Sequence, residues 1–227
     1  MLAHRLSQDE IKEICVLAHG KHNDHLKEQL YQLTLDDDRR VAVNALWALT
    51  HFASSDYEWL YAKSHHLIDR CLVEHDATKL RLLLALLLRQ PFGKEDIRTD
   101  FMDYCLVRIA DSKSAYAVRA QCIKLAYEQM RYWPELLGEL RQVLDMIGCE
   151  PLSPGLRSAW KQVIKKINAA QRHLSVGIVD DTSGAQMKTP YGRRPLAVNH
   201  REFYFPIYSM SSTLTHCLHV DLDLLGS

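Results

Sequence analysis

Three histidines near the N-terminus have the most suggestive chemical spacing in the chain. His19, His22 and His25 recur at intervals of three, and such spacing can bring two imidazoles together on a helix face, where zinc could bind. Gly20 interrupts this helix, and no cysteine or carboxylate set completes a ligand shell at a recognisable spacing. Surface or capping histidines are the better interpretation, so we expect neither a metal nor a cofactor.

Two further histidine groups have the same outcome. His65 and His66 are adjacent, and His216 and His219 flank Cys217 and Leu218. Adjacent side chains on a helix or strand point to different faces, so these groups do not converge on one ion. We predict no metal site from them.

Tryptophans and a basic strip could contact nucleic acid. Trp47 and Trp160 fall inside apolar helical stripes, which favours core packing over base stacking, and Trp133 stands apart. The basic strip lies on the last expected helix (Lys161, Lys165, Lys166 and Arg172). It could meet phosphate, but a solvated helix face is the commoner explanation.

No catalytic signature stands out in the chain. The sequence contains no GxSxG, Walker loop, GxGxxG or HExxH motif. We therefore predict a noncatalytic protein.

Composition points to an ordinary globular chain in a reducing compartment. The 227 residues have a formal net charge of zero, whereas nucleic-acid-binding domains are usually strongly basic. Residues 153–227 hold nine Lys and Arg against five Asp and Glu, so the C-terminal third is the basic end. The six cysteines form no CxxC, the N-terminus lacks the apolar run of a secretion signal, and Leu82–Leu88 is too short to cross a bilayer. We expect a cytoplasmic protein with no membrane partner.

An internal repeat dominates the first three-quarters of the chain. Four segments share an apolar leader, a polar follower and a helical apolar stripe: RVAVNALWAL (40–49), ATKLRLLLAL (77–86), AYAVRAQCIKL (115–125) and SPGLRSAWKQV (153–163). The leaders Val43, Leu80, Val118 and Leu156 are 37, 38 and 38 residues apart. Such a period indicates a repeat architecture.

Each repeat is expected to contain two helices. Starts are predicted at Asp36–Asp38, at Asp76, at Ser112 or Ser114, and at Ser153 with Pro154. Second helices are predicted over 57–74, 97–110 and 134–147, and a capping box at 7–10 opens a first pair over residues 8–35. One pair cannot bury its apolar face alone, so the pairs must stack. The run 80–88, apolar all round, suits a helix in mid-stack. A single helical bundle is the alternative, which the equal spacing disfavours.

The acidic starts, the Val-Arg or Leu-Arg pairs and the Ala/Leu-rich stripes resemble HEAT repeats, and more loosely armadillo repeats, over roughly residues 8–172. The resemblance implies an all-α fold, a short right-handed α-α superhelix over residues 1–173. It also implies a ladder of polar contacts between repeats at the matching positions, Asp76, Arg81, Arg119 and Arg157. Asn44 departs from the pattern.

In HEAT-like proteins the second helices line a concave groove where partners bind. The solvent-side positions of those helices here are Tyr61, His65, Asp69, Asp96, Asp100, Asp103, Tyr104, Arg108, Glu135, Glu139 and Asp145. This surface is acidic and carries tyrosines, which favours a basic peptide or protein segment over phosphate. The alternative is a set of solvated helix faces.

The C-terminal part does not continue the repeat. Residues 174–195 read as a linker rich in Gly, Ser, Thr, Asp and Pro. Within 196–227, apolar residues alternate with polar ones in two runs, which favours a β-hairpin. Because a lone hairpin is marginal in water, it docks, pairs with another chain or stays disordered.

Three functions remain open at the level of sequence. The leading one is a noncatalytic scaffold or adaptor that holds a protein segment with basic residues in the groove. The second is a DNA-binding protein or enzyme similar to the HEAT-like alkylpurine DNA glycosylases. Those enzymes need a basic channel with Trp and a catalytic Asp, and the predicted groove is acidic. The third is a HEAT-type chaperone or lyase subunit.

Overall fold

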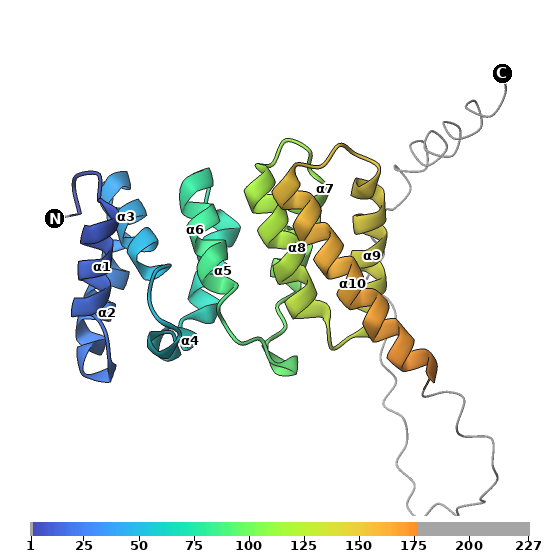
Figure 1. Ribbon diagram of the computed structural model, residues 1–227, viewed down its shortest axis with the longest axis horizontal. Coiled ribbons are helices and arrows are strands. Elements are labelled where there is room, and N and C mark those ends of the chain that lie inside the picture. Colours follow the sequence, from blue (N-terminus) through green and yellow to red (C-terminus); the bar gives the residue numbers. More distant parts are fainter. Residues whose placement is uncertain (1, 177–227) are drawn as a thin grey trace, which may run out of the picture. The chain divides into compact units, whose positions relative to one another are not determined.

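A computed structural model describes residues 2–176, and this part of the chain is entirely helical (Figure 1). The helices are α1 (Gln8–Leu17), α2 (Asp24–Leu33), α3 (Arg39–Leu49), α4 (Glu58–Tyr61), α5 (Ser64–Val73), α6 (Ala77–Leu87), α7 (Thr99–Ala110), α8 (Tyr116–Met130), α9 (Pro134–Gly148) and α10 (Pro154–Val176). Short 3-10 turns lie at Lys21–Asn23, Ser54–Asp56 and Lys94–Asp96.

The predicted solenoid of helix pairs is confirmed. The leaders Val43, Leu80, Val118 and Leu156 lie near the starts of the consecutive first helices α3, α6, α8 and α10. Helix α3 contacts α6 and α6 contacts α8, while the second helices form a parallel series in which α5 contacts α7 and α7 contacts α9. Second helices also pack against the first helix of the next pair, as α2 does on α3, α5 on α6 and α7 on α8 (Figure 1). The pairs therefore stack in two layers.

Most helix starts follow the residues that the sequence indicated. Ser7 and Glu10 form the expected capping box, Asp38 and Asp76 cap α3 and α6, and Pro154 opens α10. The expected serine cap of α8 is wrong. Ala115, whose side chain has no polar atom, occupies the N-cap position, and the Ser114 hydroxyl donates to Asp111 at 2.8 Å instead.

Two glycines have structural reasons for their places. Gly20 has a φ of 87° after α1, a left-handed conformation that side chains rarely adopt. At Gly148 a Cβ atom would lie 3.1 Å from the Trp160 ring, so a glycine allows α10 to approach α9 closely. The Trp160 indole donates to the Leu144 carbonyl at 2.7 Å across the same contact.

The expected helix over 57–74 is interrupted, in contrast to the prediction. It divides into α4 and α5 at Lys63, whose φ of −101° and ψ of 5° leave the helical region. The Lys63 ammonium lies 2.8 Å from Glu28, 4.8 Å from the Tyr31 ring centre and 5.2 Å from that of Trp59. These contacts, which bring Lys63 against the preceding pair, are not visible in local periodicity.

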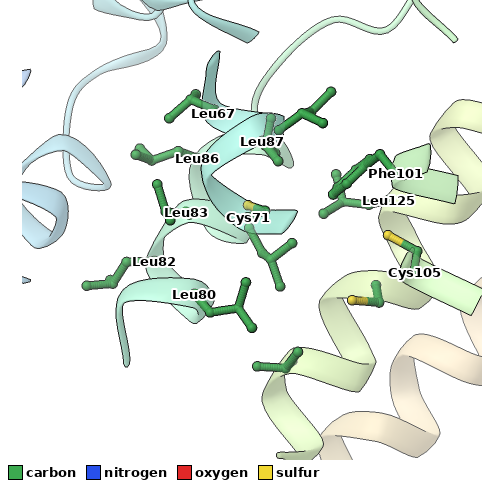
Figure 2. Close-up of a cluster of buried hydrophobic side chains, with 14 of the residues drawn as sticks. Leu67, Cys71, Leu80, Leu82, Leu83, Leu86, Leu87, Phe101, Cys105 and Leu125 are labelled. Carbon is green, nitrogen blue, oxygen red and sulfur yellow. The ribbon is translucent and has the colours of Figure 1, made fainter. Parts of the chain in front are cut away.

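Helix α6 forms the centre of the core, as its all-round apolar sequence predicts. The buried side chains on α6 cover more than half of its circumference (Leu80, Leu82, Leu83, Leu84, Leu86 and Leu87), and Arg81 lies on the remaining, exposed side. Figure 2 shows all of these leucines except Leu84 beside Cys71 of α5, with Phe101 and Leu125 of the next pair on the neighbouring side. Neighbours on three sides, α3, α5 and α8, explain why no face of α6 is polar throughout.

Polar contacts also join consecutive pairs, at separations close to the repeat period. The Arg89 guanidinium, just after α6, donates to the Phe52 carbonyl at 3.2 Å, and Arg131, just after α8, donates to the Phe92 carbonyl at 3.0 Å. Arg70 on α5 likewise reaches the Thr34 carbonyl at 2.9 Å. Each bond satisfies a carbonyl in the segment that follows a helix of the preceding pair.

Residues 2–175 form one compact unit. Helix α10 extends to Val176, which is three residues into the predicted linker. The rest of that linker and the predicted hairpin at 196–227 lie outside the described residues. Within the described part, no helix combines the length and the apolar character needed to span a membrane.

Candidate protein-binding surfaces

Two surfaces are distinguished by the helices that form them. We call the outward side of α2, α4, α5, α7 and α9 the second-helix face, and that of α3, α6, α8 and α10 the first-helix face. Ten of the eleven predicted groove residues lie on the second helices, and Asp96 ends the turn just before α7. Nine of them are exposed, whereas Tyr104 and Arg108 are half-buried.

Arg98, which the sequence analysis did not single out, neutralises two of the predicted acids. It caps the start of α7, and its guanidinium donates to Asp69 at 2.8 Å and to Asp100 at 2.6 and 2.9 Å. Hydrogen bonding by Arg98 lowers the pKa of Asp100, and the two carboxylates raise the pKa of Arg98. His65 Nδ1 lies 3.5 Å from the same guanidinium. Asp69 and Asp100 are therefore less available to a partner than their exposure indicates.

Two other predicted acids also have local partners. The Arg141 guanidinium donates to both carboxylate oxygens of Asp145, at 2.8 and 2.9 Å, one turn apart on α9. Asp96 accepts the Gly93 N–H at 2.8 Å within its own turn. The Arg141 ion pair offsets the charge of Asp145, whereas the Gly93 N–H holds the Asp96 carboxylate in its own turn without neutralising it.

Three acids on α7 and α9 have no positively charged partner among the described residues. Asp103, Glu135 and Glu139 are exposed, and within the described residues none of them has an ion-pair or hydrogen-bond partner. Val107 follows Asp103 by one turn on α7 and is 68% exposed, and Met146 on α9 is 40% exposed. This part of the second-helix face combines unpaired carboxylates with exposed apolar side chains.

Tyr104 belongs to the packing rather than to an exposed aromatic surface, contrary to the expectation. Its ring stacks on Phe101 with the centres 6.3 Å apart, and the Arg108 guanidinium lies 5.0 Å over it. Burial raises the pKa of Tyr104 to about 12. Of the two predicted tyrosines, Tyr61 is the more accessible, at 39%.

The four predicted ladder residues contact other groups rather than one another. Asp76 accepts the Arg39 Nε–H from α3, 37 residues away, and caps α6. Arg119 is buried, and its Nε donates to the Ile109 carbonyl at 2.9 Å. Arg157 donates to the Leu152 carbonyl at 3.1 Å. Arg81 is exposed instead and has no such bond among the described residues.

Arg81 lines a hollow of about 700 Å³ between α3, α6 and the N-terminal segment. Its lining residues are Arg5, Leu6, Ser7, Gln8, Val43, Asn44, Trp47, Thr78, Arg81 and Leu82. A second hollow, of about 460 Å³, lies further along the same face between α8 and α10. Neither was predicted, because each is formed by helices that are distant in sequence.

Charge is segregated between the two kinds of helix. Helices α3, α6, α8 and α10 contain eleven Lys and Arg and one acid, Glu128, whereas α2, α4, α5, α7 and α9 contain nine Asp and Glu and four Lys and Arg. Helix α1, at the end of the stack, is acidic. The basic surplus that the sequence analysis placed at the C-terminal end therefore extends back through the first helices of the stack.

The remaining sequence candidates are explained by local contacts. His19 Nδ1 bonds to Asp56 at 2.8 Å, and His66 Nδ1 to the Tyr31 hydroxyl at 2.8 Å. In residues 2–176 no three His, Cys, Asp or Glu side chains converge in a way that could hold a metal ion. His216 and His219 lie outside the described residues. Trp47 and Trp160 pack partly buried against the core, and Trp133 lies under Lys94 at 4.9 Å.

Comparison with known proteins finds one family. The family model described as a HEAT repeat domain matches residues 1–167, which includes all the first helices except the last part of α10. Neither a search of curated proteins nor a search of solved structures finds a match.

Proposed function

Because the chain belongs to the HEAT repeat domain family, we propose that it is a noncatalytic scaffold that binds a basic protein segment on its second-helix face. HEAT repeats commonly mediate protein–protein interaction and are typically noncatalytic. The proposal narrows that general role to one surface and one kind of partner.

The free carboxylates of α7 and α9 carry this proposal. Asp103, Glu135 and Glu139 are exposed and unpaired within the described residues, while nearby acids are already neutralised by Arg98 and Arg141. Unpaired carboxylates attract lysine and arginine without first breaking an internal ion pair.

Exposed apolar side chains supply the contact area that charge alone does not. Val107 lies one turn from Asp103, and Met146 lies two turns from Glu139. Burying apolar surface stabilises a complex by about 25 cal/mol per Å², whereas exposed charge pairs contribute mainly to the rate and specificity of association. A segment with lysines on one side and leucines on the other fits this surface better than a uniformly basic one.

Binding of a labelled peptide with alternating Lys and Leu pairs tests the proposal. Fluorescence anisotropy with the full chain should show a dissociation constant that rises about tenfold in the Asp103→Lys/Glu139→Lys variant, since each reversal costs roughly 0.5–1 kcal/mol. The matched control is Glu13→Lys/Asp37→Lys, which changes the net charge equally at exposed positions that have no ion pair among the described residues. Equal loss in the two variants, or none in either, would contradict a site on the second-helix face.

A reducing cytoplasmic location is part of the same proposal. Within the described residues Cys71, Cys105 and Cys122 are buried and form no disulfide. Buried unpaired thiols are usual in proteins that fold where disulfides do not persist.

A further inference from the structure

The first-helix face contains a hollow whose lining has no carboxylate. Two arginines, Arg5 and Arg81, stand at this hollow, and both are exposed. The polar side chains beside them are uncharged, and Leu6, Val43, Trp47 and Leu82 provide the apolar part of the lining. Such a lining suits a ligand that combines an apolar group with a carboxylate.

Arg81 differs from the residues that occupy the same position in the other repeats. Asn44 donates to the Leu2 and His4 carbonyls at 2.8 and 2.7 Å. Arg119 and Arg157 donate to the carbonyls of Ile109 and Leu152. These three side chains satisfy backbone groups, whereas the Arg81 guanidinium has no hydrogen-bond or ion-pair partner within the described residues. It is therefore available to an external acceptor.

Two acids that lie two residues from the lining in the sequence are already engaged. Asp76 accepts from Arg39 and from the Thr78 and Lys79 N–H groups, and Arg39 is the main cause that lowers the pKa of Asp76. Glu10 accepts the Ser7 N–H at 2.8 Å and bonds to His4 at 2.7 Å. Since neither carboxylate reaches Arg5 or Arg81, the positive charge at the hollow is not neutralised internally.

The second hollow extends the basic surface along the stack. Lys124 and Lys166 line it together with Gln90 and Gln162. Glu128 is its one acid, and both Arg131 and Lys166 contact that carboxylate, at 2.8 and 3.3 Å. A ligand that runs along first helices α3 to α10 meets positive charge at both ends of its path.

From these contacts we propose that the first-helix face binds an acidic polypeptide segment in extended form. An apolar side chain of the segment enters the hollow beside Trp47, and a flanking carboxylate pairs with the guanidinium groups of Arg81 and Arg5. The planar guanidinium can donate two parallel hydrogen bonds to a carboxylate, so the pairing is specific in geometry as well as in charge.

Trp47 favours a polypeptide over nucleic acid at this place. Its ring is half-buried against the core and meets His51 edge-on, with the ring centres 5.5 Å apart at 87°. A base would need an open aromatic face on which to stack. The hollow therefore offers side-chain accommodation rather than a stacking platform.

The test uses the full chain and a labelled ten-residue glutamate peptide with a central leucine. We expect Arg5→Gln/Arg81→Gln to weaken binding at least tenfold in 0.15 M salt. Lys94→Gln/Lys113→Gln, which removes the same charge from exposed sites away from the hollow, should change binding less than twofold. Both pairs of positions are exposed, and thermal unfolding followed by circular dichroism verifies that each variant is folded.

Two results would overturn the proposal. One is an equal effect of the two variant pairs, which would mean nonspecific attraction. The other is tighter binding of a ten-residue oligothymidylate than of the peptide, with the same dependence on Arg81, which would make the face a nucleic-acid surface. The Asp103→Lys/Glu139→Lys variant should still bind the glutamate peptide. A failed proposal for the first-helix face can therefore be distinguished from a failed proposal for the second-helix face.

Discussion

Lys27 and Asp56 form a buried ion pair that joins the first two helix pairs. Their side chains are 2% and 4% exposed, and Lys27 Nζ lies 3.0 Å from Asp56 and 3.0 Å from Asp24. Burial by itself lowers the pKa of Lys27 and raises that of Asp56. Hydrogen bonds from the Gly20 N–H, Lys27 and His19 outweigh it at Asp56, so its pKa is lowered, and the two carboxylates raise the pKa of Lys27. Both groups are therefore charged in the folded protein near neutral pH.

Asp56→Asn tests this pair at the scale of one residue. Removing one partner of a buried ion pair leaves the other incompletely compensated, and we expect the free energy of unfolding to fall by about 3 kcal/mol. Urea unfolding monitored by circular dichroism measures it. Asp37→Asn, at an exposed position, should change it by less than about 0.5 kcal/mol. A loss below about 1 kcal/mol for Asp56→Asn would mean that Asp24 alone sustains the lysine.

Single residues also show the limit of sequence reasoning here. Arg81 and Arg119 follow the same motif, yet one is exposed at a hollow and the other is 1% exposed and bonded to Ile109. Arg98 pairs with Asp69, 29 residues away, from a position between helices. These outcomes depend on which helices meet in space, and local periodicity carries no information about that. The apolar positions, by contrast, could be assigned, because burial follows directly from the helical period.

At the scale of the element, α6 combines a clear start with burial of its leucines against three neighbouring helices. Asp76 accepts the Thr78 and Lys79 N–H groups at 2.8 and 3.0 Å, which satisfies donors that have no partner within the helix. Its leucines face α3, α5 and α8. The sequence predicted both features, since an aspartate precedes a run that has no polar stripe. The break at Lys63 was not predictable, because a lysine is compatible with a continuous helix.

Leu83→Ala should be strongly destabilising. The side chain is fully buried at the centre of the stack, and its truncation leaves a cavity that rigid neighbouring helices cannot close. We expect a loss of about 3 kcal/mol in the free energy of unfolding, measured by urea titration. The matched change, Leu17→Ala on α1 at a site 57% exposed, should cost less than about 1 kcal/mol. Similar losses at the two sites would argue against α6 as the core helix.

For the whole helical unit, the ionised groups favour a stability plateau around neutral pH. Hydrogen bonds from the Ser7 backbone, followed by those from His4, lower the pKa of Glu10 from 4.5 to about 2, and the pKa values of Asp56, Asp76 and Asp100 are also lowered. A carboxyl with a lowered pKa contributes stability above its unfolded value and loses it as pH falls through the folded value. Burial raises the pKa of Tyr57 from 10.0 to about 12. The contribution of Tyr57 to the free energy of unfolding is therefore fully present below the pKa that tyrosine has in the unfolded chain, and it is lost as pH rises toward the folded value.

Urea unfolding across pH tests this expectation. The midpoint should be nearly constant from about pH 6 to 9, fall as pH decreases from about 5 to 2, and fall again above about pH 10. Glu10→Gln should flatten part of the acid limb, because it removes a carboxyl whose pKa is lowered to about 2 in the folded protein. A midpoint that rises on acidification to pH 3 would contradict the assignment of these carboxylates as favourably bonded.

The order of the helix pairs could be predicted from the sequence, whereas the separation of basic and acidic helices was not recognised there. The 37- and 38-residue spacings predicted the stack, because equal intervals leave little choice about which helices are equivalent. The separation of basic first helices from acidic second helices was also present in the sequence, but it becomes visible only once each charge is assigned to its layer. The predicted groove therefore captured the acidic side and missed the basic one.

The bonds from Arg89 to Phe52 and from Arg131 to Phe92 have a consequence for the length of such a protein. Each joins a pair to its immediate predecessor across 37 or 39 residues. An in-frame duplication of one such unit would add an arginine that can donate to the carbonyl of the preceding unit. It would also add a carbonyl that can accept from the arginine of the following unit. Growth or shortening by whole units thus preserves every junction, while an insertion of half a unit would leave an arginine without its carbonyl.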